Sequence, residues 1–319
     1  MKNYIIRRFF QFIPVLIGVS ILIFILMRIV PGDVALMILI GPEGTGEVDP
    51  IQLEALRDEL GLNRPLPVQY FTWVGGMLKG DFGHSLRTDI PVFDEIRTRF
   101  PLTFEIATLT VLLSMSIALP LGIIMAMRQD TWIDYTARIV TIGGLAMPNF
   151  WVATLMLLFM VIWFNWIPPL GYEHIWDDPW ANFQQVIWGA LGLGYLLAAV
   201  VARMTRSTLL EVLRQDYIRT AWAKGLRERS VVIRHALKNA LLPVVTIVGL
   251  QYAALIGGTV IMEQIWNLPG LGQSLIVSIN SRDFPMVQAL VMLFAIIILF
   301  ANLVVDLLYA WLDPRVRYG

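Results

Sequence analysis

The sequence offers few residues that could build a catalytic site. It contains three histidines, far apart in the chain, and no cysteine. The motifs H-E-x-x-H and G-x-S-x-G, which mark zinc proteases and serine hydrolases, are both missing. A phosphate-binding G-x-x-x-x-G-K-[ST] loop is missing too, because the dipeptide Gly-Lys does not occur. We therefore expect no enzyme active site, and no ATP binding through such a loop.

One acidic pair, Asp177-Asp178, has the residue type that metal ions prefer. It stands alone before Pro179, so we interpret it as a solvated turn and predict no metal site. The absence of cysteine also excludes disulfides, Cys-ligated zinc and iron–sulfur clusters.

The composition indicates a membrane protein. Of 319 residues, 57% are apolar and 15% are charged, and the mean hydropathy is +0.68. Soluble chains are about 45–50% apolar and about 25% charged, and they need a polar exterior. The 24 Lys and Arg balance the 24 Asp and Glu, so no basic excess suggests a nucleic-acid partner. Lipid is the expected main solvent.

Several apolar stretches meet or approach the roughly 20 residues that a helix needs to cross a bilayer. They lack the strict alternation of β-barrel strands. The sequence therefore predicts an all-α integral membrane protein with six transmembrane helices, over residues 9–27, 106–127, 139–164, 186–202, 241–262 and 286–311. The first stretch has a basic start like a signal peptide but no small-residue cleavage site, so we interpret it as a retained anchor.

The distribution of Lys and Arg predicts that both termini are cytoplasmic. With the N-terminus inside, the inner segments carry 16 Lys and Arg and the outer segments carry 7, and short loops rich in these residues stay inside. Residues 31–100, with 11 acidic and 6 basic residues, then form a small extracytoplasmic domain. It would be a solvated cap or a docking surface for an external partner. Helical spacing of apolar residues occurs within it at 51–60, 68–78 and 92–99.

Ionisable residues at membrane depth are the usual candidates for transport chemistry. Arg28, Glu105 and Asp306 lie near the ends of predicted spans, where each can reach headgroups or a helix end. A proton-coupled carrier would place such a group near the midplane, and this pattern does not. Prolines within spans, which bend or break helices, are Pro14, Pro120, Pro148 and Pro243.

The largest inner segment, residues 203–238, carries nine Lys and Arg and three acidic residues. Its sequence predicts a short helix from Asp216, a turn at Gly225, and a return helix over 230–242 that ends at Pro243. Two interpretations are open. The segment is a topology signal bound to anionic lipid, or it is a lever inserted into a soluble partner.

An ordered set of motifs resembles the permease subunits of bacterial and archaeal ABC importers, in the dipeptide/oligopeptide group. The central ones are DYIRTAWAKGL at 216–226 and RHALKNALLPVVT at 234–246. Others span nearly the whole chain: Arg7-Arg8, Val30-Pro31-Gly32-Asp33, Leu60-Gly61-Leu62, Pro65, Gln69-Tyr70, Gly80-Asp81-Phe82-Gly83, Ser85, Pro148-Asn149-Phe150-Trp151, Ala202-Arg203-Met204-Thr205-Arg206-Ser207, Glu263, Pro269-Gly270-Leu271-Gly272, Asp283-Phe284-Pro285 and Asp313-Pro314-Arg315. The chain has Arg219-Thr220-Ala221 where the general importer motif has Glu-Ala-Ala.

The resemblance implies the fold and the partners. It implies a type I importer permease fold in three parts: residues 1–30, the extracytoplasmic domain 31–100, and a core permease domain 101–319 with a cytoplasmic coupling loop at 203–240. It implies a heterodimer with a second, related permease, two ABC ATPase subunits and an extracytoplasmic substrate-binding protein. ATP and Mg would be bound by the ATPases, while this chain would bind no cofactor and catalyse nothing. The expected location is a bacterial or archaeal plasma (inner) membrane.

The resemblance also assigns residues that couple the chain to an ATPase. Gly225 would permit a tight turn, Lys224, Arg227 and Arg229 would meet acidic or backbone acceptors or be simply solvated, and Ala221 and Ala223 would allow close approach. The full assigned set is Asp216, Arg219, Thr220, Ala221, Ala223, Lys224, Gly225, Leu226 and Arg227. Four polar residues in or near spans would line the pathway or form helix-to-helix hydrogen bonds: Asn149, Gln251, Thr259 and Asn302.

The expected cargo is a dipeptide or oligopeptide. Glutathione, a nickel chelate or an oligosaccharide are alternatives within the same architecture. A secondary transporter would show two repeated halves, but the long outer segment after the first span has no counterpart after the fourth. An intramembrane enzyme would need Ser and His or paired carboxylates at membrane depth, and the sequence places none there.

Overall fold

The structure, a computed structural model, describes residues 2–29, 34–40, 48–59, 61–169 and 171–312. Within these ranges every regular element is a helix, and the only β pairing is an isolated bridge between His84 and Pro91. The predicted all-α class is confirmed. The motif residues 30–33, 60 and 313–315 lie outside the described part of the chain, and so does the side chain of Asp306.

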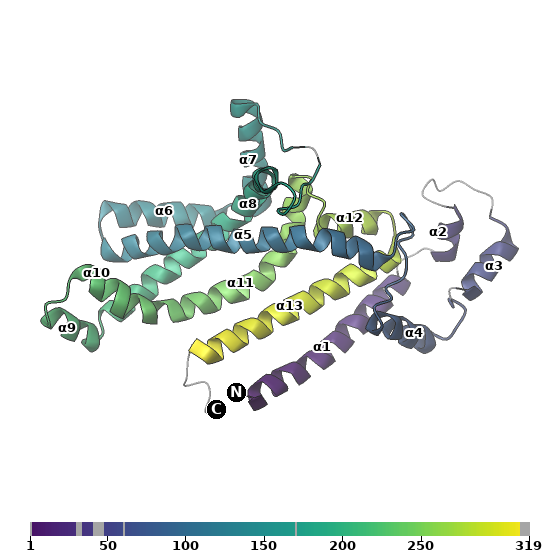
Figure 1. The fold of residues 1–319 in the computed structure, drawn as a ribbon, viewed down its shortest axis with the longest axis horizontal. Helices are drawn as coiled ribbons and strands as arrows, with labels where there is room; N and C mark the ends of the chain where they lie inside the picture. The colour runs from purple at the N-terminus through teal and green to yellow at the C-terminus, as the bar shows by residue number, and fades with distance from the viewer. Residues whose placement is uncertain (1, 30–33, 41–47, 60, 170, 313–319) are drawn as a thin grey trace. The chain divides into compact units, whose positions relative to one another are not determined.

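Five helices are long and apolar enough to cross a membrane, and each contains one predicted span. They are α1 (Lys2–Ile29), α5 (Val92–Met127), α8 (Pro179–Leu213), α11 (Leu237–Ile265) and α13 (Phe284–Leu312) (Figure 1). The sixth crossing exists only if α6 (Trp132–Ala146) and α7 (Asn149–Phe164) form one broken span.

The predicted span 139–164 is two helices rather than one. Helices α6 and α7 meet at 103°, and Met147 between them is extended, with φ −97° and ψ 130°. Pro148 accounts for the break, because it lacks an N–H and disfavours helical backbone in the residue before it. The hydroxyl of Tyr195 donates to the carbonyl of Met147 at 2.5 Å, which satisfies one acceptor at the break.

Helix α5 begins before the predicted span 106–127. The stretch 92–99, whose apolar residues have helical spacing, is helical and is the start of a 36-residue helix that continues through Pro101 into the span. A proline removes one helical hydrogen bond. The helix continues because both sides of Pro101 are packed: Val92 and Ile96 in one apolar cluster, Leu102 and Ile106 in another.

The chain divides into two compact units, which we describe separately. The first comprises Met1–Ile5, Leu102–Leu268 and Ile298–Gly319, and the second comprises Ile6–Pro101 and Pro269–Ile297. The separate extracytoplasmic domain at residues 31–100 stays a prediction.

The first unit is built around the packing of α8 against α11. Leu197 and Val201 of α8 share one buried cluster with Val244 of α11, and Leu193 shares another with Met262. Helix α5 approaches α8 closely at Gly122, where an added Cβ would lie 2.7 Å from the carbonyl oxygen of Ala202. Small residues of this kind allow helix backbones to approach in membranes.

The second unit contains four short helices, α2 (Val34–Ile40), α3 (Pro50–Glu59), α4 (Leu66–Leu78) and α12 (Leu271–Asn280). Its apolar core joins the start of α5 to α12 and the start of α13, with Val92, Leu271, Met286 and Leu290 buried together.

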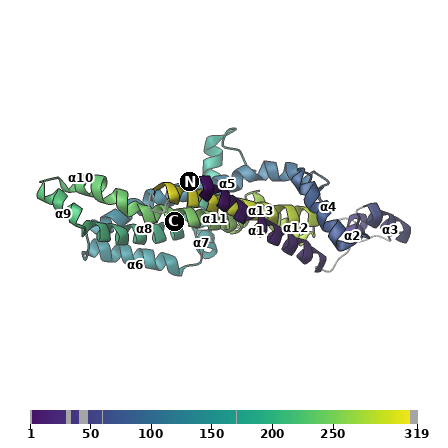
Figure 2. The ribbon, with the colours of Figure 1, turned by 90° about the horizontal axis from the view of Figure 1, so that it is seen from below.

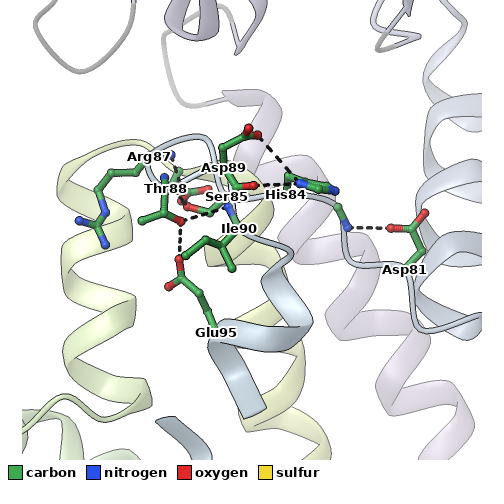
Figure 3. A network of polar contacts seen from close by, with 10 residues as sticks. Asp81, His84, Ser85, Arg87, Thr88, Asp89, Ile90 and Glu95 are labelled. Carbon is green, nitrogen blue, oxygen red and sulfur yellow. Dashed lines mark hydrogen bonds and ion pairs between the residues drawn. The ribbon is translucent and has the colours of Figure 1, made fainter. Parts of the chain in front are cut away.

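A polar network holds the loop before α5 in place (Figure 3). The hydroxyl of Ser85 donates to the carboxylate of Asp283 at 2.5 Å, and it accepts the N–H of Thr88 at 3.2 Å. Thr88 in turn donates to Glu95 of α5. Ser85 and Asp283 come from two of the motifs that carry the family resemblance, 198 residues apart in sequence. Their contact gives both motifs a structural role.

Candidate functional site

The predicted inner loop is a helix pair that extends the two central spans. Helix α8 runs on to Leu213, and α9 (Asp216–Ala223) follows after two residues. The chain then turns into α10 (Glu228–Ser230), a π-helical segment η1 (Val231–Ala236), and α11. Figures 1 and 2 both show α9 and α10 at the same end of the first unit, where α8 ends and α11 begins. The predicted short helix, turn and return are confirmed.

Helix α9 is amphipathic and anchored on one side. Ile218 is fully buried and Ala221 nearly so, in a cluster with Leu209 of α8, Ala126 of α5 and Val231 of η1. The spacing of three residues puts both anchors on one helix face. This face holds α9 against three other helices, so α9 is part of their packing rather than a free loop.

Gly225 ends α9 in the manner expected of a left-handed residue. Its φ is +75°, its N–H donates to the carbonyl of Trp222 at 2.9 Å, and the N–H of Leu226 donates to the carbonyl of Ala221 at 3.4 Å. This pair of bonds is the Schellman motif, which favours glycine because other residues are strained there. The predicted tight turn is confirmed.

An uninterrupted exposed surface surrounds this turn. All residues from 222 to 229 are exposed, including Lys224, Arg227 and Arg229. Trp222 and Leu226 add apolar area, with 44% and 37% of their surfaces exposed. We call residues 222–229 the inner platform. A surface that combines exposed cations with an exposed indole on a fixed helix pair is suited to protein contact.

Most of the predicted coupling residues are exposed, either in the inner platform or on the preceding helix α9. Exposed residues are Asp216, Arg219, Thr220, Ala223, Lys224, Gly225, Leu226 and Arg227. Ala221 differs from these, because it lies in the buried anchor of α9, and its role in coupling stays a prediction. Arg219 pairs with Asp216 at 3.3 Å, an exposed contact that contributes little to stability.

The predicted end of the return helix at Pro243 is wrong. Helix α11 continues through Pro243 to Ile265. Ala240 and Val244 on either side of the proline are buried against other helices. Packing on both sides therefore maintains the helix despite the missing backbone donor.

A buried ion cluster between α6 and α8 was not predicted from the sequence. Asp134 of α6 has no exposed surface, and both its oxygens accept from the guanidinium of Arg206 of α8 at 2.8 Å. Arg138 approaches the same carboxylate at 3.2 Å, and the N–H of Asp130 donates to it at 3.1 Å. This bidentate pair ties the start of α6 to the C-terminal part of α8.

Two further carboxylates are held inside the first unit. Glu105, expected near headgroups or a helix end, accepts from the hydroxyl of Tyr172 and the amide of Asn182, each at 3.2 Å. Burial and the Glu105 carboxylate raise the pKa of Tyr172, so its phenol stays protonated and donates. Glu263, fully buried near the end of α11, accepts from Thr103 at 2.7 Å.

The four predicted pathway residues lie in different surroundings. Asn149, the first residue of α7, accepts the N–H of Phe150 at 2.9 Å. Thr259 is fully buried and donates to the carbonyl of Ile256 in its own helix at 2.8 Å. Gln251 and Asn302 are partly buried. Their role in a pathway stays a prediction.

No group of three or more metal-binding side chains occurs in the part of the chain that the structure describes. The candidate functional surface is the inner platform.

Comparison with known proteins supplies the family. The model of the family described as "Binding-protein-dependent transport system inner membrane component" matches residues 118–318, and the N-terminal model of such components matches residues 1–107. The "Glutathione transport system permease protein GsiC" of Escherichia coli strain K12 is 38% identical over 318 residues, covering all of both chains. The proteins of the same name from Shigella boydii and Pectobacterium atrosepticum give the same identity and coverage.

Among solved structures, an amino acid ABC transporter crystallised with histidines matches 65% of this chain and 89% of its own, with 15% identity and a TM-score of 0.48. The sequence matches cover nearly the whole chain. The chain belongs to the family of binding-protein-dependent transport system inner membrane components.

Proposed function

We propose that this chain forms half of the translocation pathway of an ATP-driven importer for short peptides. A second, related permease would form the other half, and an extracytoplasmic binding protein would deliver the cargo. Two ATPase subunits would bind ATP and Mg and hydrolyse the nucleotide, and this chain would be non-catalytic. The observation that carries the proposal is the inner platform, an exposed cationic surface on a helix anchored to three spans.

The anchoring supports a lever mechanism. When ATP binding closes the ATPase dimer, a helix seated in one ATPase moves with it. Ile218 and Ala221 pack α9 against α5, α8 and η1, so these elements would move with α9. The Asp134–Arg206 pair would extend the movement from α8 to α6. Reorientation of these helices would open the pathway to the other side of the membrane.

The identity of relatives named for glutathione transport supports a peptide cargo, because glutathione is itself a small peptide. At 38% identity the cargo itself can differ, and glutathione, a nickel chelate or an oligosaccharide are the alternatives. Purification of the full chain from its native membrane would identify the accompanying ATPases and binding protein. The ligands of that binding protein would then be measured. Recovery without any ATPase would contradict the proposal.

A substitution at Gly225 tests the inner platform directly. Gly225→Pro removes the N–H that caps α9 and forbids the observed φ of +75°. We expect membrane insertion to persist, while co-purified ATPase falls and stimulation of ATP hydrolysis by loaded binding protein is lost.

Gly80 provides a matched control. It follows Lys79 at the end of α4, has a φ of +82°, and closes the same pair of hydrogen bonds, from Gly80 to Met77 and from Asp81 to Gly76. Gly80→Pro is therefore the same backbone change in the predicted outer segment, and we expect it to leave ATPase recovery intact. Equal loss of ATPase in both variants, or in neither, would count against the inner platform.

A further inference from the structure

A cavity of about 300 Å³ lies in the second unit, apart from the inner platform. It is lined by the end of α1, the loop before α4, α4 itself and the start of α13. Its walls include the rings of Phe24, Trp73 and Phe284 and the side chains of Arg28 and Arg64. Among the residues that the structure describes, the lining contains no acidic side chain. A cavity with two guanidinium groups and aromatic walls suits an anion with an apolar body.

The side chain of Gln69 connects three of the segments that line this cavity. Its side-chain oxygen accepts from Arg28, and its side-chain nitrogen donates to the carbonyls of Leu62 at 2.8 Å and Arg64 at 2.7 Å. One amide therefore joins α1, the loop and α4. Tyr70 adds a second link, with its hydroxyl 2.7 Å from that of Ser20.

Within the described part of the chain, no acidic residue pairs with either arginine near the cavity. The Arg28 guanidinium lies over the ring of Phe24, 4.9 Å from its centroid. The Arg64 side chain folds back over Gly61, so that a Cβ there would lie 3.4 Å from its Cδ and Nε atoms. Among the described residues, the guanidinium of Arg64 has no hydrogen bond or ion pair. Its positive charge is therefore available to a ligand.

We expect the cavity to lie at the level of a membrane interface. Arg28 is at the end of the apolar helix segment Phe10–Ile29, which is long enough to span a bilayer. Arginine and tryptophan at helix ends are typical of the headgroup region. Lipid phosphates occupy that region, next to apolar acyl chains.

We propose that this cavity binds the phosphate of a membrane phospholipid, with Arg28 and Arg64 facing the phosphate and Phe24 and Trp73 facing the glycerol and upper acyl chains. An anionic headgroup is favoured because the described lining residues carry two positive charges and no negative one. The site is independent of which cargo the chain transports. Free phosphate would satisfy the cations but leave the aromatic walls in water.

Photolabelling tests the site. The full chain in detergent is exposed to phosphatidylglycerol with a diazirine near the glycerol end of one acyl chain, and labelled peptides are mapped. We expect label on peptides that contain Phe24, Trp73 and Pro285. Diacylglycerol with the same diazirine lacks the phosphate and should label these peptides weakly. Equal labelling by both lipids would overturn the proposal.

Arg64→Gln is the test variant, because Arg64 supports no described hydrogen bond through its side chain. We expect labelling of the cavity peptides to fall about fivefold, the effect of one basic residue on an anionic lipid. Arg64→Lys should retain most of it. Arg87→Gln removes an exposed charge elsewhere in the same unit and should change nothing. An equal effect of Arg64→Gln and Arg87→Gln would contradict the site.

Competition separates the two sources of phosphate. Both ligands would occupy the same cations, but only the lipid also contacts the aromatic walls, so we expect unlabelled phosphatidylglycerol to displace the label at a lower concentration than inorganic phosphate does. Displacement by inorganic phosphate at an equal or lower concentration would assign the cavity to free anions and overturn the proposal. The melting temperature of each variant shows that the fold is intact.

Discussion

Asp134 is a buried carboxylate that needs positively charged neighbours. A carboxylate without exposed surface is stable only with charged partners, because burial removes its hydration. Arg206 and Arg138 supply them, at 2.8 Å and 3.2 Å. Arg206 makes the bidentate contact and its side chain is 18% exposed, while that of Arg138 is 33% exposed. We infer that Arg206 is the principal partner.

We expect Asp134→Asn to destabilise the chain by about 3 kcal/mol, because it leaves a partly buried guanidinium without its counter-charge. Asp134→Leu combined with Arg206→Met should recover most of this loss, since an apolar pair can replace a buried ion pair. Thermal unfolding of the purified variants measures both effects. A double variant no better than Asp134→Asn would show that the pair is not the source of the stability.

The structural roles of single residues can be predicted from the sequence in some cases and not in others. Gly225 was recognisable because a glycine after an Ala-rich helix is a local signal for a left-handed turn. The Asp134–Arg206 pair was not, since its members are 72 residues apart and nothing local in a single sequence links them. The family motif implies close approach at Ala221, and the helical period places this residue on the same face as the buried Ile218.

Helix α9 depends on its buried face for its position. It has eight residues, too few for an isolated helix to be stable in water. Its order therefore comes from tertiary packing through Ile218 and Ala221 and from the turn at Gly225. Loss of the buried anchor should loosen α9 without affecting the spans that it contacts.

We expect Ile218→Ala to cost about 2–4 kcal/mol of local packing, so that α9 no longer moves together with α5 and α8. ATP hydrolysis without binding protein should persist, while its stimulation by loaded binding protein falls. Ile233→Ala is the matched control, because Ile233 lies in the same helix pair but is 53% exposed. Equal stimulation in the two variants would refute the role of the anchor.

The two prolines in apolar runs show why element boundaries were only partly predictable. Pro148 breaks its run and Pro243 does not, although the local chemistry is the same. Residues 146–148 are all exposed within this chain, so no packing opposes the break. Ala240 and Val244 are buried around Pro243 and preserve the helix. The outcome depends on tertiary contacts that a linear pattern does not contain.

The whole molecule is a set of long apolar helices in the inner membrane, and its class followed directly from hydropathy. Orientation rests on the excess of Lys and Arg in the inner segments, and it stays a prediction. The absence of cysteine makes it simple to test, because an introduced cysteine is the only thiol in the chain.

We expect Arg87→Cys to react with a membrane-impermeant maleimide in spheroplasts, whose inner membrane is intact. Gln129→Cys should react only in inverted membrane vesicles. Both residues are exposed turn positions, so accessibility to the reagent is matched. Labelling of both from one side would refute the orientation and place the inner platform on the wrong face.

The separation of Asp134 from Arg206 has a consequence for synthesis on the ribosome. The acidic residue emerges 72 residues before its principal partner, with only Arg138 available to pair with it early. We therefore expect the amino end of α6 to reach its final packing only after residue 206 has been translated.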